Sequence, residues 1–146
     1  MTSLELLRLA SGGFFFWPCL SLTEKRIAML REYSGELLVS PVGMVAVDAA
    51  DSARGSVLSA LGRHDDAIAC LDGAAQTCRH AGAAVLAIMN GHRQALATAR
   101  RNGPGDRARA AVLARETAGR ARELGMVQDE RAALNVLRML DFHVDL

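Results

Sequence analysis

Two stretches of this 146-residue chain, 62–82 and 105–125, repeat one pattern of small residues at a spacing of 43 positions. The spacing is set by identical residues, which pair Gly62 with Gly105, Ala67 with Ala110, Ala75 with Ala118, Arg79 with Arg122 and Gly82 with Gly125. A period between about 20 and 50 residues is typical of repeat proteins, in which each unit buries its apolar face only against a neighbour. The alternative is chance likeness between two alanine-rich helices, but the matching terminal glycines favour a true repeat.

Within each repeat, small and apolar residues recur at helical spacing. The first stripe consists of Ala67, Cys70, Leu71, Ala74, Ala75, Cys78 and Ala81. The second consists of Ala110, Leu113, Ala114, Thr117, Ala118, Ala121 and Leu124. Residues at i, i+3, i+4 and i+7 share one face of an α-helix, so each stripe predicts the buried side of an amphipathic helix.

The rest of the chain predicts further helices joined by short turns. We expect helices over 23–38, 42–61, 64–81 and 83–101, one beginning at Asp106 and one opening at Asp129. Ser40-Pro41 separates the first two, and Gly82 is predicted to end its helix in the left-handed conformation. No strand is expected. The fold class is therefore predicted to be all-α, with antiparallel helical hairpins stacked as a short α-solenoid.

The predicted helix 42–61 has two distinct faces. The small and apolar side chains expected to point inward are Ala46, Ala49, Ala50, Ala53, Val57, Ala60 and Leu61. The polar side chains expected to face solvent are Asp48, Asp51, Ser52 and Ser59. In the helix 83–101, Leu86, Met89 and Leu96 are predicted inward, and Asn90-Gly91 predicts a local weakness of about 1 kcal/mol relative to alanine.

The helices predict one repeat domain over 23–140, followed by a frayed tail over 141–146. The first 22 residues form an apolar segment in which Phe14, Phe15, Phe16 and Trp17 are consecutive. This cluster is interpreted as a cap over the first helices, with a docking patch or a severed edge as the alternatives. It is too short to span a bilayer, and no basic leader precedes it, so a signal peptide is not expected.

The charge pattern argues against nucleic acid and membrane as partners. The formal net charge is only +1, which gives no global field to recruit an anionic surface. The one basic patch holds seven arginines between 100 and 122, with no aromatic residue among them for base stacking. A solvated helix face is the better interpretation of this patch.

The spacing of the cysteines and histidines does not predict a catalytic or metal-binding site. Cys19, Cys70 and Cys78 lack metal-binding spacing and favour a reducing compartment, so a cytoplasmic protein is expected. His64-Asp65-Asp66 is the only stretch that joins an imidazole to carboxylates, but no second ligand is spaced nearby. The Gly103–Asp106 loop lacks the lysine of a phosphate-binding loop and is interpreted as a turn. We therefore predict no catalytic residues, no cofactor, no metal and no enzyme activity.

The run from Gly55 to Ala74 resembles a tetratricopeptide repeat. The resemblance rests on a helix glycine, a Leu-Gly-Arg turn and following small and large residues at helical spacing, here Gly55, Leu58, Leu61, Gly62, Arg63, Asp66, Ala67, Leu71 and Ala74. The second repeat departs from this pattern with Thr98, Ala114 and Thr117 in place of Gly55, Leu71 and Ala74, so looser packing is expected there.

Over residues 30–126 the chain is similar to the C-terminal repeats of large bacterial LuxR-type transcriptional regulators and adenylate cyclases that carry an AAA-like ATPase module. The motifs that carry this resemblance are the GPGDRARA run from Gly103 and the ARELGM run ending at Met126. No ATP-binding loop, cyclase segment or DNA-reading motif is present. The resemblance implies a regulatory piece of a larger signalling protein that acts through contacts.

The sequence thus favours a non-catalytic helical-repeat module for protein–protein interaction. We expect the first arm of each hairpin to contact the partner protein, or a domain of a larger regulator, through Asp48, Arg54, Asn90 and Arg93. The alternative is a domain that senses a small-molecule effector in the groove between hairpins.

Overall fold

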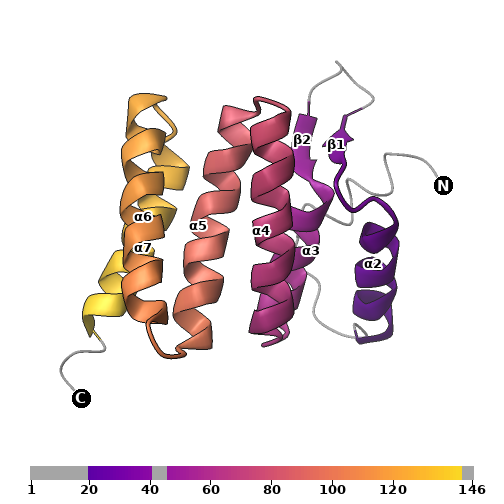
Figure 1. Ribbon diagram of the computed structural model, residues 1–146, viewed down its shortest axis with the longest axis horizontal. Helices are drawn as coiled ribbons and strands as arrows, with labels where there is room; N and C mark the ends of the chain where they lie inside the picture. The colour runs from indigo at the N-terminus through magenta and orange to yellow at the C-terminus, as the bar shows by residue number, and fades with distance from the viewer. Residues whose placement is uncertain (1–19, 41–45, 143–146) are drawn as a thin grey trace.

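The computed structural model describes residues 20–40 and 46–142, and the chain within these ranges is a stack of antiparallel helices (Figure 1). The elements in chain order are α2 (Leu20–Glu32), β1 (Leu37–Val39), β2 (Ala46–Ala49), α3 (Ala50–Ala60), α4 (His64–His80), α5 (Ala84–Arg101), α6 (Asp106–Glu123) and α7 (Val127–Phe142). The predicted all-α class is confirmed. Phe14 to Trp17, Cys19 and the tail from residue 143 lie outside the described residues.

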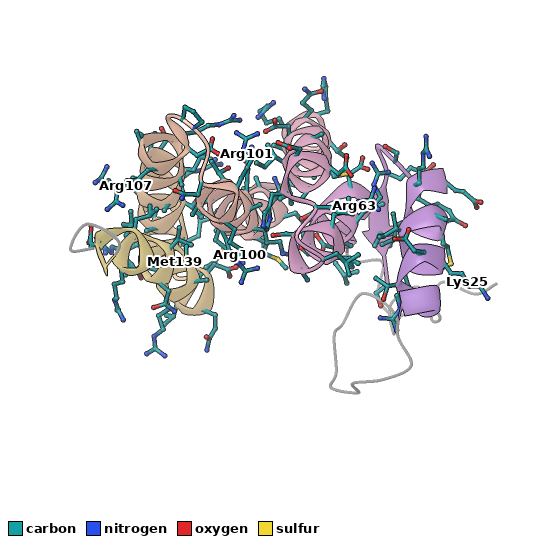
Figure 2. All side chains as sticks on the ribbon, turned by 90° about the horizontal axis from the view of Figure 1, so that it is seen from below. Lys25, Arg63, Arg100, Arg101, Arg107 and Met139 are labelled. Atoms are coloured by element: carbon teal, nitrogen blue, oxygen red, sulfur yellow. The ribbon has the colours of Figure 1, made fainter. Side chains whose placement is uncertain are left out.

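The helices form two layers, and α5 packs against helices of both. Each helix from α3 to α7 packs against its neighbours in sequence, and α5 also packs against α3 and α7. Among the described elements, α4 and α6 make little contact with each other. Figure 2, which looks along the helices, therefore has α4 and α6 on one side of the stack and α3, α5 and α7 on the other.

The duplicated glycines at the ends of the repeats adopt the same unusual backbone conformation. Gly82 has φ 62° and Gly125 has φ 69°, both in the left-handed region that glycine occupies without a Cβ clash. The next amides close the same hydrogen bond back to the helix, from Ala83 N to Cys78 O at 2.9 Å and from Met126 N to Ala121 O at 2.8 Å. The left-handed helix end predicted at Gly82 is confirmed, and Gly125 ends its helix in the same conformation.

The predicted stripes form the core. Buried members are Ala67, Cys70, Leu71, Ala74 and Cys78 from α4, and Ala110, Ala114, Thr117, Ala118 and Ala121 from α6. Both cysteines of α4 are free thiols. The prediction is wrong at the last residue of each stripe, because Ala81 and Leu124 follow their helices and are exposed.

The expectation of no strand is also wrong. Strand β1 pairs antiparallel with β2, with Leu37 opposite Ala49 and Leu38 opposite Asp48. The helix predicted over 23–38 ends at Glu32, and the helix predicted over 42–61 begins only at Ala50. Alanines at helical spacing favour a helix, but strand pairing across the Ser40-Pro41 break outweighs this local preference.

The polar face predicted for 42–61 is buried. Asp48, Asp51, Ser52 and Ser59 are each less than a tenth exposed, whereas Ala60 and Leu61, predicted inward, are exposed. Buried carboxylates require partners, and these come from residues distant in sequence, as described below. Ala49, Ala50 and Ala53 are buried as predicted. The periodicity therefore located part of the buried face, but it assigned the polar residues to solvent incorrectly.

Candidate functional site

A buried ion pair joins β2 to α5. One Arg93 nitrogen, Nη1, donates to both carboxylate oxygens of Asp48, at 3.0 and 2.7 Å, and to the Ser52 hydroxyl at 2.8 Å. The Asp48 side chain is only 12% exposed and the Arg93 side chain 25%. The Asp48 carboxylate also accepts the amide of Ala49 at 2.9 Å. The Asp48 carboxylate is largely excluded from water, and these hydrogen-bond donors replace the water molecules that it has lost.

A second polar cluster lies one turn further along α3. The Asp51 carboxylate accepts hydrogen bonds from the Ser34 hydroxyl at 2.9 Å and from the Gly35 amide at 2.9 Å, which tie the loop after α2 to α3. Arg54 lies 3.3 Å from Asp51 and donates from Nε to the sulfur of Cys70 at 3.1 Å. Both clusters hold elements together by hydrogen bonds that cross from one element to another.

The four residues predicted to contact a partner separate into two groups. Asp48, Arg54 and Arg93 occupy the two polar clusters, where their charges are already paired within the chain. Asn90 is 1% exposed and its amide nitrogen donates to the carbonyl of Leu71 at 2.9 Å. Its side chain is therefore not on the surface. A partner-binding role for all four stays a prediction.

A groove that the sequence did not reveal runs between α4 and α6, with α5 as its floor. Its volume is about 400 Å³. Small and larger residues of α5 line it together with charged and apolar side chains of the flanking helices. The small residues are Ala84, Ala87 and Gly91, at i, i+3 and i+7. This stripe is the sequence signal that could have located the groove.

Gly91 has a packing role in this groove. A Cβ built there would lie 2.5 Å from the hydroxyl oxygen of Thr117, so α6 approaches α5 closely only because the side chain is missing. The local weakness predicted at Asn90-Gly91 therefore coincides with a helix contact that requires glycine. The same groove contains the one unsatisfied oxygen of Asn90, Oδ1, which has no hydrogen-bond partner among the described residues.

The opposite side of α5 carries its own residues. At 100° per residue, Val85, Met89, Leu96 and Arg100 lie on the side of Arg93 and roughly opposite Ala84, Ala87 and Gly91. Val85 is 51% exposed and Arg100 is also exposed. Figure 2 shows Arg100 and its neighbour Arg101 pointing to opposite sides of the stack.

A histidine connects α5 to α7. Nδ1 of His92 lies 3.3 Å from a carboxylate oxygen of Asp129, and both side chains are about four-fifths buried. Burial lowers the pKa of His92, and the neighbouring Arg93 lowers it further, against the opposing effect of Asp129. His92 is therefore neutral at pH 7, and its contact with Asp129 is not an ion pair.

The turn between α5 and α6 is closed by a second arginine and aspartate. Arg101 donates to both oxygens of Asp106, at 2.7 and 2.6 Å, and to Asp65 at 3.0 Å, while the amide of Gly103 donates to Asp106 at 2.9 Å. Arg101 and the Gly103 amide hold the pKa of Asp106 at about 2, and the two carboxylates raise the pKa of Arg101. The carboxylate of Asp106 thus fills this turn.

The Asp106 contacts predict acid sensitivity. Because its pKa in the folded chain lies below its ordinary value of 3.8, this group stabilises the fold fully above about pH 4 and loses that effect as the pH falls toward 2. Asp106→Asn is expected to lower Tm at pH 7, and the difference from the parent chain should narrow between pH 4 and pH 2. Thermal melts followed by circular dichroism measure this, with the exposed Glu123→Gln as control. A difference that stays constant down to pH 2 would contradict the assignment.

The residues 64–66, considered above as metal ligands, have other partners. Asp65 pairs with Arg101, and Asp66 pairs with Arg63 at 2.8 Å. Within residues 20–40 and 46–142, no three histidine, cysteine or acidic side chains gather closely enough to hold a metal ion. In the same ranges, no helix combines the length and the apolar character needed to cross a bilayer.

Comparison of the chain with protein families, with curated proteins and with solved structures found no match.

Proposed function

We propose that this chain is a non-catalytic helical-repeat module that binds another protein through the face formed by α3, α5 and α7. The observation that carries the proposal is that α5 packs against both α3 and α7, so these three helices lie in one layer. In repeat proteins such a layer is the usual binding surface, because each unit adds one helix to it.

The side chains on this face suit a protein partner. Val85 is half exposed, Met89 and Leu96 are partly buried, and Arg100 is exposed without an ion pair among the described residues. Protein interfaces are enriched in methionine and arginine, and they combine apolar anchors with a polar rim. The Asp48–Arg93 pair lies next to these residues and fixes α5 against β2, which keeps the surface rigid.

The resemblance to tetratricopeptide repeats supports the same function. Gly55 approaches Leu71 of the next helix so closely that an added Cβ would lie 2.7 Å from Leu71 Cγ, and this is the role that the resemblance assigns to that glycine. We propose that the chain is a repeat module of this class and that its partner is a regulatory protein or a domain of a larger regulator.

Affinity capture from a lysate of the source cells tests the proposal. The parent chain should retain a specific protein, and Arg100→Glu should reduce the retained amount at least tenfold, because reversing a rim charge opposes the complementary charge of the partner. Arg115→Glu is the matched control, since Arg115 is an equally exposed arginine on α6 in the other layer. Equal loss with both variants, or capture that neither variant changes, would contradict binding at this face.

A further inference from the structure

The groove between α4 and α6 has a stripe of small residues along its floor. Ala84, Ala87 and Gly91 of α5 leave space that the flanking helices do not close, since α4 and α6 scarcely touch among the described residues. The resulting volume of about 400 Å³ lies within the range of small-molecule sites. Apolar walls are supplied by Ala75, Ile88 and Leu113.

Inside this groove, one buried acceptor has no donor. Asn90 is 1% exposed, and its amide nitrogen is fixed by the carbonyl of Leu71 at 2.9 Å, which leaves Oδ1 as the free group. A buried carbonyl oxygen without a partner carries an energetic cost, because it has lost its hydrogen bonds to water. A ligand that brings an N–H or O–H donor to this oxygen removes that cost.

The rim of the groove carries three charges that make no ion pair among the described residues. Arg79, from the end of α4, and Arg120, near the end of α6, lie at the same end of the stack as the first turn of α5 (Figure 1). Two guanidinium groups attract an anion, so this end favours a carboxylate. Glu116 lies one turn from Arg120 along α6, beside Thr117, which packs on Gly91 of α5, and it favours a cation.

We propose that this groove binds a small zwitterion of the amino-acid class with an apolar side chain. The ligand carboxylate lies between the guanidinium groups of Arg79 and Arg120. Its ammonium group donates to Asn90 Oδ1 and to Glu116, and its side chain contacts Ile88 and Leu113. This ligand therefore offers a carboxylate to the two arginines, and an ammonium group to Glu116 and to the unpaired Asn90 oxygen. The site lies on the opposite side of α5 from the proposed docking face. A negative result for ligand binding would therefore leave the docking proposal standing, and a negative result for docking would leave the ligand site standing.

Thermal melts of the purified chain with the free amino acids test this site. An apolar amino acid such as leucine or phenylalanine should raise Tm by about 4 °C at ten times its Kd. N-acetylleucine, which lacks the ammonium, and leucinamide, which lacks the carboxylate, should each bind at least tenfold more weakly. Equal binding of either derivative would overturn the zwitterion assignment. No shift with any amino acid at 10 mM, roughly the weakest affinity that a groove of this kind would show, would overturn the site.

Substitutions at the rim connect the binding to the groove. Glu116→Gln and Arg120→Gln replace exposed side chains, and each should weaken binding about tenfold, which corresponds to the loss of one charge-assisted contact. Arg115→Gln, on the same helix but outside the groove, should leave Kd unchanged. Asn90 is less suitable for substitution, because its amide also satisfies Leu71. Unchanged affinity in both rim variants would place the ligand elsewhere and contradict the proposal.

Discussion

Replacing Arg93 with alanine is expected to lower the free energy of unfolding by about 3 kcal/mol. The Asp48 carboxylate, 12% exposed, would lose the guanidinium that donates to both of its oxygens and would keep only the Ala49 amide. Removing one partner of a buried ion pair costs about 3–5 kcal/mol, and the remaining exposure of Arg93 places the value at the low end. Ser52 would also lose its donor. Urea unfolding followed by circular dichroism measures this loss.

A double variant separates the stranded charge from other effects. Adding Asp48→Asn to Arg93→Ala removes the unpaired carboxylate, and the double variant should recover a large part of the loss because a neutral amide is cheaper to bury. Arg115→Ala, an exposed arginine on α6, should change stability by less than about 0.5 kcal/mol. A loss below about 1 kcal/mol for Arg93→Ala would contradict the structural importance given to this pair.

The second large effect is expected at the contact between Gly55 and Leu71. Leu71 is completely buried, so Leu71→Ala should cost about 3–4 kcal/mol. Gly55→Ala should also destabilise the chain, by about 1–2 kcal/mol, because its new Cβ would lie 2.7 Å from Leu71 Cγ and 3.1 Å from the carbonyl of Ala67. Both losses are large relative to a total stability of about 5–15 kcal/mol.

The two substitutions should not add. Leu71→Ala removes the closer of the two contacts of the Cβ at position 55 and leaves the Ala67 carbonyl. Gly55→Ala should therefore cost less in that background, and the coupling should favour the double variant by about 1 kcal/mol. In the second repeat the larger residue is on the other helix, because Thr98 replaces Gly55 and Ala114 replaces Leu71. Thr98 and Ala114 are both completely buried. Denaturation of the four proteins of this cycle measures the coupling. Strictly additive losses would contradict the proposed contact.

The helical stripes and their turns were predictable because both depend on local features. A run of small residues at i, i+3 and i+4 has one way to form a buried helix face, and the glycines at 82 and 125 mark left-handed ends that few other residues adopt. The repeat at 43 positions also indicated that adjacent helices pack together. These features predicted α4 and α6, and they placed the turns that join the helices of the two hairpins.

The remaining features depend on partners distant in sequence. Asp48 is buried because Arg93, 45 residues later, reaches it, and Asp51 is buried because the loop at Ser34 closes over it. A helical pattern assigns polar residues to solvent and contains no information about such partners. The β1–β2 pairing and the groove are non-local in the same way, since the groove requires three helices to be placed before its space exists.

We propose above that a partner protein docks on the face formed by α3, α5 and α7. The most direct test places a photo-activatable cross-linking residue at position 100, on that face, and in a second protein at position 115, on α6. After irradiation in the source cells, mass spectrometry identifies the attached proteins. We expect one specific protein to be cross-linked to position 100 and not to position 115. The same protein joined equally from both positions, or only from position 115, would contradict it.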